Sequence, residues 1–149
     1  MSLKVAIVGC GKIAGGFDSA RPDAARLPIT HAGAYARDGR FEITGCVEPD
    51  RDRRLAFMSQ WGISRGFRTI DEAKSSGARF DVISICSPTR SHARDLEVSL
   101  DIGPRLIFCE KPVDLSVARA AECAAAVKAA GVVCMIGFQR RFDPTFAEA

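Results

Sequence analysis

The chain has 149 residues, enough for one domain that buries roughly 70% of the surface its unfolded form exposes, so no disulfide staple is needed. Hydrophobic residues make up 47% of the sequence and charged residues 26%, which excludes an intrinsically disordered chain. The formal net charge is +3, and an acid interrupts the basic run RDRR, so a solvated helix face is favoured over a nucleic-acid-binding patch.

Short apolar runs alternate with segments of helical composition along the whole chain. Strands are expected at residues 3–8, 41–47, 80–86, 105–109 and 132–136, with a weaker candidate near 66–68. Helices are expected at residues 31–38, 50–61, 71–76, 92–102 and 116–130. Strict alternation with short connections predicts a parallel sheet with helices on both faces. We therefore expect a single α/β domain, a doubly wound (Rossmann) sheet of about six mostly parallel strands, whose ligands bind at the carboxyl ends of the strands.

A glycine-rich turn, GCGKIAGG, follows the first predicted strand. Gly9, Gly11 and Ala14 fit the pattern G-x-G-x-x-A, in which the first glycine permits a tight turn and the second lets the backbone approach a pyrophosphate. The small third residue lets helix and strand pack closely, and the helix N-terminus offers free N–H groups to the anion. An ordinary glycine turn is the alternative. The position between strand and helix favours a dinucleotide site, to which Lys12 and Ile13 would also belong.

Glu48 stands at the end of the second predicted strand, in CVEPD. A carboxylate there can accept hydrogen bonds from the adenosine ribose hydroxyls, and it repels a 2′-phosphate, which favours NAD. Arg51 and Arg53 follow closely and could bind that phosphate instead, so NADP stays open. The other alternative is a surface glutamate near a turn.

Residues 15–29 look like an insertion that splits the first helix, which resumes with Thr30 as a plausible N-cap. The insertion also explains why Glu48 lies further from Gly11 than the usual ~20 residues. Arg21 and Arg26 would lie near the mouth of the site and could neutralise a phosphate or an acidic substrate. The favoured interpretation is a loop that is polar because it is solvated.

Five motifs occur in order along the chain. They are VGCGKIA after the first strand, CVEPD after the second, ICSPTRSHARDL after the fourth, CEKPV after the fifth and IGFQRRFDP after the sixth. In this order they resemble the glucose-fructose oxidoreductase, inositol dehydrogenase and rhizopine-catabolism (Gfo/Idh/MocA) family. The resemblance covers essentially the whole chain, which corresponds to the N-terminal, nucleotide-binding half of such a protein.

The resemblance implies that the strand-four motif borders the cofactor. Its candidate residues are Cys86, Ser87, Pro88, Thr89 and His92. His92 follows Ser91, a candidate N-cap, so a role for His92 in starting the helix is the alternative. His31, at the start of another helix, is expected to pack rather than to act.

The resemblance also implies that Glu110 and Lys111 reach the nicotinamide end of the cofactor. Lys111 is the catalytic candidate, because an ammonium near the reacting oxygen stabilises the alkoxide character that grows as hydride leaves the carbon. Glu110 would hold the ammonium in place and Pro112 would fix the backbone. The alternative is a solvent-exposed ion pair of little energetic value. Arg140 and Arg141 resemble basic residues of the family, one of which could point toward the cleft, but a solvated connector is favoured.

Such proteins carry a second α/β domain that covers the nicotinamide and supplies a catalytic histidine, a role that neither histidine of this chain can fill. We expect residues 1–144 to form the NAD(P)-binding domain and residues 145–149 to start the connection to a second domain, so that this chain alone binds cofactor without turnover. The resemblance implies a parent NAD(P)-dependent oxidoreductase that transfers hydride to or from a secondary hydroxyl of a sugar, cyclitol or related polyol. A homo-oligomer is possible in the full-length protein. The alternative is a non-enzymatic dinucleotide-binding sensor or scaffold.

The six cysteines form no C-x-x-C pair and stand in or beside apolar runs, where a reduced thiol behaves as a small hydrophobe. The apolar stretch before Cys10 is shorter than the ~7 to 15 residues of a signal-peptide core. No run approaches the ~18 apolar residues of a membrane span. We therefore expect a soluble cytoplasmic protein without a membrane or nucleic-acid partner and without a metal site.

Overall fold

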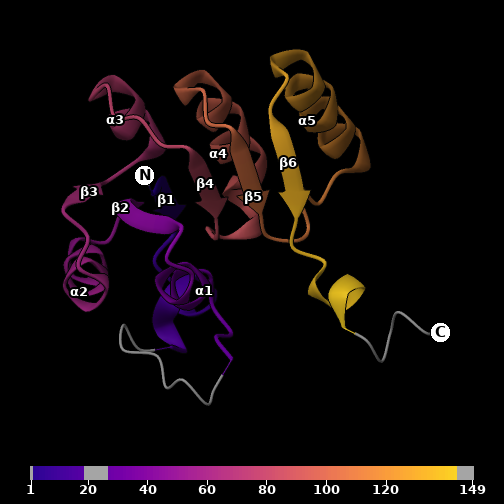
Figure 1. Cartoon of the computed structure of the whole chain (residues 1–149). Coiled ribbons are helices and arrows are strands. Elements are labelled where there is room, and N and C mark those ends of the chain that lie inside the picture. The colour runs from indigo at the N-terminus through magenta and orange to yellow at the C-terminus, as the bar shows by residue number, and fades with distance from the viewer. Residues whose placement is uncertain (1, 19–26, 144–149) are drawn as a thin grey trace.

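A parallel sheet of six strands forms the centre of the chain, in the order β3-β2-β1-β4-β5-β6. The computed structural model describes residues 2–18 and 27–143. The strand order reverses between β1 and β4, which lie side by side in the middle of the sheet (Figure 1). The strands are β1 (Leu3–Val8), β2 (Phe41–Val47), β3 (Arg65–Phe67), β4 (Val82–Ile85), β5 (Leu106–Cys109) and β6 (Val133–Ile136).

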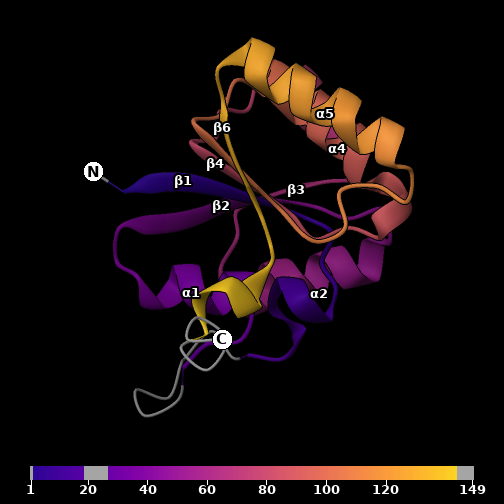
Figure 2. The same ribbon diagram turned by 90° about the vertical axis from the view of Figure 1, so that its right-hand side faces the viewer.

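Helices cover both faces of the sheet. Figure 2 shows α1 and α2 on one face and α4 and α5 on the other, and α3 packs beside α4. None of the described helices is long and apolar enough to cross a membrane. The helices are α1 (His31–Arg37), α2 (Arg51–Trp61), α3 (Ile70–Ser75), α4 (Thr89–Ile102) and α5 (Val117–Ala130), with the short turns η1 (Lys12–Gly16) and η2 (Gln139–Phe142).

Two apolar clusters, one on each face, hold these layers together. Successive strand residues point to opposite faces, so Val5 and Ile7 of β1 join the cluster under α2, while Val8 joins the cluster under α4. These three side chains are at most 3% exposed. A strand covered on both faces reads as a continuous apolar run, which is why the sequence shows β1 so clearly.

The predicted doubly wound α/β fold is confirmed, and the weaker strand candidate near residues 66–68 is β3. One helix boundary was predicted wrongly. The helix expected from residue 92 begins at Thr89, and Pro88 rather than Ser91 occupies the N-cap position. The amide of Ser91 already donates to the carbonyl of Pro88 at 2.8 Å, so Ser91 lies inside the first turn.

Thr30 is the N-cap of α1, as predicted, and its hydroxyl accepts a hydrogen bond from the amide of Gly33. The Asp18 carboxylate accepts hydrogen bonds from the amides of Ile29 and Thr30 at 2.9 and 2.8 Å. Asp18 therefore joins the two ends of the predicted insertion. Arg21 and Arg26 lie outside the described residues.

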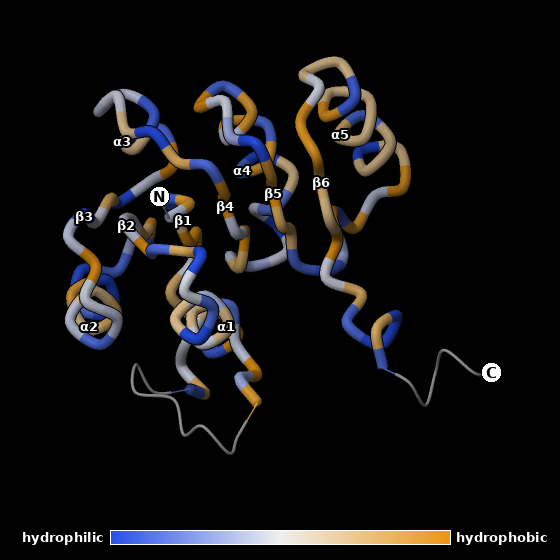
Figure 3. The backbone as a smooth tube through the Cα atoms, in the orientation of Figure 1, coloured by the Kyte–Doolittle hydropathy of each residue, from blue (hydrophilic) through white to orange (hydrophobic). Residues whose placement is uncertain are grey.

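One face of β6 carries apolar side chains that the described helices leave uncovered. Val133 is 61% and Met135 39% exposed, and Phe138 and Phe142 beyond the strand are more than half exposed. The hydropathy colouring of Figure 3 shows β6 as an apolar segment. This face marks the outer edge of the sheet, away from the β1–β4 reversal.

Candidate functional site

Backbone hydrogen bonds join the residues that follow the strands into one row. In each bond the amide of the residue just after one strand donates to the last carbonyl of the neighbouring strand, at 2.7 to 2.9 Å. The donors are Glu48, Gly9, Cys86, Glu110 and Gly137. The glycine turn and the turn that carries Lys111 therefore leave the same edge of the sheet, on either side of the end of β4.

Gly9 has a backbone conformation and surroundings that no other residue would tolerate. Its φ is +85°, and an added Cβ would lie 2.6 Å from the backbone Cα and N of Ser87. Gly11 differs, because a Cβ built there would meet nothing within 4 Å. Gly9 thus permits the ends of β1 and β4 to lie close together. Gly11 leaves its backbone accessible to a ligand.

The helix expected after this turn is only a π-helical turn of five residues, η1, because the chain leaves the helical path at Phe17 for the insertion. Ala14 is fully buried, as expected for close packing. Gly15 makes the tighter approach, since its Cβ would lie 2.5 Å from Nε1 of Trp61 in α2. The pattern G-x-G-x-x-A predicts this packing role for Ala14 alone. Lys12 is exposed, with its ammonium 5.9 Å from the centre of the Phe17 ring.

Glu48 is 6% exposed and ties the glycine turn to the start of α2. Its carboxylate accepts hydrogen bonds from the amides of Cys10 and Asp50, both at 3.1 Å. Arg53 approaches the same carboxylate at 3.4 Å. The acid is therefore a structural part of the turn as well as the candidate partner of a ribose.

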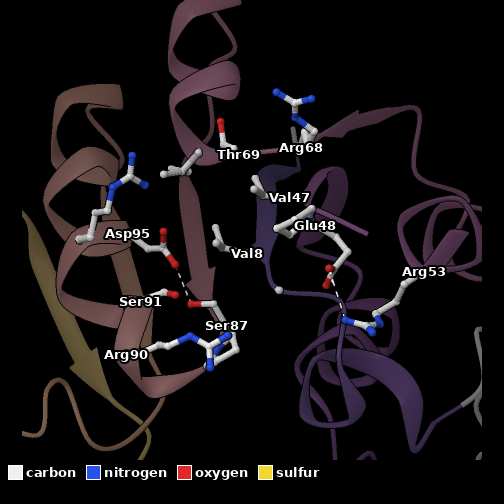
Figure 4. A pocket seen from close by; sticks show the side chains of 15 residues that line it. Val8, Val47, Glu48, Arg53, Arg68, Thr69, Ser87, Arg90, Ser91 and Asp95 are labelled. Carbon is white, nitrogen blue, oxygen red and sulfur yellow. Dashed lines mark hydrogen bonds and ion pairs between the residues drawn. The ribbon is translucent and has the colours of Figure 1, made fainter. Parts of the chain in front are cut away.

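A pocket of about 310 Å³ opens beside Glu48, between the ends of β1 and β2 and the start of α4 (Figure 4). Figure 4 shows Glu48 and Arg53 on one wall and Ser87, Arg90 and Asp95 on the opposite wall. Arg68, just after β3, and Arg94 of α4 complete a basic rim around it. Of Arg51 and Arg53, the two arginines expected near the adenosine ribose, only Arg53 lines this pocket.

The rim residues Arg68, Arg90 and Arg94 were missed. A sequence signal did exist, because Arg90 and Arg94 belong to the motif ICSPTRSHARDL and Arg68 directly follows β3.

The start of α4 contributes a buried polar pair to this wall. Ser87 donates its hydroxyl to the carboxylate of Asp95 at 2.6 Å. Burial raises the pKa of Asp95, and the Ser87 hydrogen bond opposes that shift. Cys86 is buried, and desolvation raises its thiol pKa well above the usual value, so it stays a neutral thiol with no nucleophilic character. Thr89 and Pro88 begin the helix beside them.

His31 is the partner that the structure gives to the Glu110 carboxylate. Nε2 of His31 lies 3.0 Å from Oε1 of Glu110, with the two side chains 10% and 16% exposed. The His31 ring also packs edge-on against Phe108, so it does more than the expected packing. This hydrogen bond holds the pKa of Glu110 below its usual value. Glu110 was expected to hold the Lys111 ammonium in place, but its side-chain partner is His31. Lys111 is exposed and acts on the carboxylate through its charge and its backbone amide.

The His31–Glu110 pair predicts a pH-dependent stability. A carboxyl whose folded-state pKa is lowered stabilises the fold above its unfolded value of 4.5, and the contribution is lost as the pH falls through the lowered value. We expect His31→Ala to cost about 1 kcal/mol more at neutral pH than at a pH below the lowered pKa of Glu110, where only the packing of the ring on Phe108 is lost. Thermal unfolding of both proteins across this range measures the difference. His31→Gln, which keeps a donor, should lose less, and a pH-independent cost would contradict the pair.

His92 is 2% exposed and has a carbonyl oxygen at each ring nitrogen. Nδ1 lies 2.7 Å from the carbonyl of Pro112 and Nε2 lies 2.6 Å from the carbonyl of Ser87. His92 therefore links the strand-four motif to the turn of Lys111 from beneath. Arg140 and Arg141 are exposed in η2. Within residues 2–18 and 27–143, His, Cys, Asp and Glu side chains form no group that could hold a metal.

The strand order, the reversal beside the glycine turn and the acid behind β2 together define a dinucleotide-binding Rossmann domain. The profile of the Gfo/Idh/MocA oxidoreductase family, with its NAD-binding Rossmann fold, matches residues 3–138. The chain belongs to this family, and its NAD-binding character follows.

The curated relatives include inositol dehydrogenases and a D-apiose dehydrogenase. The chain is 44% identical over 123 residues to inositol 2-dehydrogenase of Rhizobium meliloti, a match that covers 83% of this chain and 36% of that protein. It is 39% identical over 69 residues to scyllo-inositol 2-dehydrogenase (NAD(+)) of Bacillus subtilis, covering 46% of this chain and 20% of that protein. The match thus covers little more than a third of the length of the first relative and a fifth of the length of the second.

Among solved structures, scyllo-inositol dehydrogenase from Lactobacillus casei, with bound NAD(H) and scyllo-inositol, superposes with a TM-score of 0.82. The sequence identity is 21%, and the match covers 99% of this chain and 39% of that chain. At this identity the likeness supports the fold alone.

Proposed function

We propose that this chain is the cofactor-binding part of an NAD-dependent dehydrogenase that moves hydride between nicotinamide and a secondary hydroxyl of a cyclitol, sugar or related polyol. The observation that carries the proposal is the shared sheet edge, where the open glycine turn at Gly11 and the exposed Lys111 flank the end of β4. The inositol dehydrogenases among the relatives favour a cyclitol as substrate.

The described residues fit a dinucleotide laid along this edge. The pocket beside Glu48 suits the adenosine half, and the open side of Gly11 leaves room for a pyrophosphate. The nicotinamide end would then reach Ser87 and the turn of Glu110 and Lys111. When bound, NAD supplies the hydride chemistry, and the protein supplies position and charge.

Lys111 is the residue that we assign to the reacting oxygen. Its ammonium is exposed at the sheet edge and stabilises negative charge that develops on the substrate oxygen. Its neighbour Glu110 is fixed by His31, which limits the freedom of the turn. A cofactor-sensing module without turnover would have no use for an ammonium at this place, so the enzyme is favoured over the sensor.

The domain boundaries and the setting of the protein belong to the same proposal. We assign residues 1–144 to the cofactor domain and residues 145–149 to a connection with a second domain that would bring the general base. All six cysteines are unpaired, which supports a reducing, cytoplasmic compartment. A small polyol-like molecule is the proposed partner, and assembly of the full-length protein into a homo-oligomer stays a prediction.

Calorimetric titration of this chain with NADH and NADPH tests the cofactor assignment. We expect NADH to bind more tightly, and Glu48→Gln to weaken NADH roughly tenfold through loss of charged hydrogen bonds to the ribose. Glu42→Gln, the same change near the other end of β2, is the control. Failure of both dinucleotides to bind below about 1 mM, a limit of −4.1 kcal/mol, would refute the proposal.

A further inference from the structure

Asp95 of α4 is a buried acid whose hydrogen-bonding capacity is only partly used. The residue is 7% exposed. One of its carboxyl oxygens accepts a hydrogen bond from the Ser87 hydroxyl at 2.6 Å, and Ser87 is the only hydrogen-bond partner that the described residues give to this carboxyl. Buried polar atoms of folded proteins nearly always have a partner, so the second oxygen needs an explanation.

The second carboxyl oxygen of Asp95 is open to the pocket beside Glu48 and is not sealed in the core. In the described part of the chain, the only buried side-chain nitrogen or oxygen without a partner is Nε1 of Trp61. Asp95 lines the pocket, and Figure 4 shows one of its oxygens turned to Ser87 and the other turned away from it. A bound molecule can therefore supply the missing donor.

The rest of the pocket suits a flat heterocyclic base. Val8, Val47 and Ile70 line it with apolar side chains that are at most 4% exposed. Arg68 and Arg90 are exposed at its rim, and a planar guanidinium can stack on an aromatic ring. An apolar interior with a few polar groups at fixed places is the usual composition of a small-molecule pocket.

Adenine is the part of the proposed cofactor that carries a donor for this oxygen. Glu48, the candidate partner of the adenosine ribose, lies on the opposite wall, so the attached base would extend across the pocket toward α4 (Figure 4). The 6-amino group of adenine donates hydrogen bonds, whereas an ionised carboxyl group only accepts them. A carboxylate at this edge of the base would therefore select a base that has an amino group.

We propose that Asp95 is a specificity-determining residue that accepts a hydrogen bond from the 6-amino group of the bound adenine. This role rests on the proposed function, because it needs a dinucleotide in the pocket. Ser87 holds the carboxyl from its place just after β4, where the two halves of the cofactor would meet. Arg94, the neighbour of Asp95 in the chain, is paired with Asp71 at 2.6 Å and leaves the second oxygen unoccupied.

Calorimetric titration with NADH and with reduced nicotinamide hypoxanthine dinucleotide tests this role. The analogue has a carbonyl oxygen in place of the 6-amino group, so an acceptor would face the Asp95 oxygen. Because burial raises the pKa of Asp95, the titrations are run at about pH 8 to keep the carboxyl ionised. We expect the analogue to bind at least roughly tenfold more weakly, since a buried acceptor is left without a donor. Equal affinities would overturn the proposal, and this comparison needs no variant.

Asp95→Asn removes the preference in the same assay if Asp95 reads the base. A side-chain amide can turn either its N–H₂ or its carbonyl to the base, so we expect the variant to bind the two dinucleotides within about threefold of each other. Asp71→Asn is the matched control, because Asp71 loses the same charge near the pocket without lining it, and it should keep the wild-type preference. Circular dichroism shows whether both variants fold. A folded Asp95→Asn chain that keeps the full preference would mean that another group reads the base, and the proposal would be wrong.

The same titrations keep the two proposals apart. A chain that binds NADH and the analogue equally refutes the role of Asp95 and leaves the function standing. A chain that binds neither below about 1 mM refutes the proposed function, and the role of Asp95 falls with it. A preference for NADH that Asp95→Asn abolishes supports both.

Discussion

Replacing Gly9 by alanine is expected to lower the free energy of unfolding by about 3 kcal/mol or more. A left-handed backbone costs a residue with a Cβ roughly 1 to 2 kcal/mol, and Gly9 has a φ of +85°. The new Cβ would also press on the backbone of Ser87 at 2.6 Å, and such overpacking adds about 1 to 3 kcal/mol. Ser87 cannot retreat easily, because Cys86 is hydrogen-bonded to Val8 across the sheet. Urea unfolding followed by circular dichroism measures the loss.

Gly39→Ala provides the matched control for this experiment. Gly39 lies in an exposed turn before β2, its φ is not positive, and a Cβ there would meet nothing within 4 Å. We expect that change to stay within about 0.5 kcal/mol of the wild type. A Gly9→Ala chain as stable as Gly39→Ala would show that the β1 turn does not pass Ser87 as closely as described.

Gly11→Ala should have the opposite profile, with normal stability and weak cofactor binding. Its Cβ has open space, so the fold should lose less than about 0.5 kcal/mol. The same methyl group would stand where we place the pyrophosphate, and the loss of two charge-assisted hydrogen bonds corresponds to about 100-fold weaker NADH binding or more. Calorimetry with NADH measures the affinity.

The control is again Gly39→Ala, which should bind NADH like the wild type. Unchanged affinity in Gly11→Ala would mean that the pyrophosphate does not cross the glycine turn, and the cofactor placement would have to be abandoned. Together the two glycine variants distinguish a residue required by the fold from one required by the ligand.

The sequence predicted the structure best where the residue types of a short segment reflect how that segment itself is buried or capped. The last four residues of β1, Val5 to Val8, are buried on both faces and form an unbroken apolar run, and Thr30 is a residue type that favours the N-cap position it occupies. Gly9 and Glu48 were recognised because the turn and the acid stand at fixed places relative to strand ends. In each case a few neighbouring residues carry the whole signal.

Contacts between distant segments could not be predicted in the same way. His31 and Glu110 are 79 positions apart, and neither residue has a neighbour that indicates the other. The hydrogen bond between His92 and the Pro112 carbonyl depends on where α4 begins, and the predicted start of this helix was three residues too late. The packing of Gly15 on Trp61 depends on the angle between η1 and α2, which no spacing in the sequence encodes.

The hydrogen bonds from the amides of Cys10 and Asp50 to Glu48 affect the thermodynamics of nucleotide binding. With two backbone amides already satisfied, the loop is held in shape before any nucleotide arrives. Binding of the nucleotide would then cost the loop little conformational entropy. The favourable enthalpy of the new polar contacts should therefore contribute almost in full to the binding free energy. The Glu48 carboxylate can offer only its remaining lone pairs to the ribose hydroxyls. The selectivity for a ribose therefore depends on one or two carboxylate oxygens.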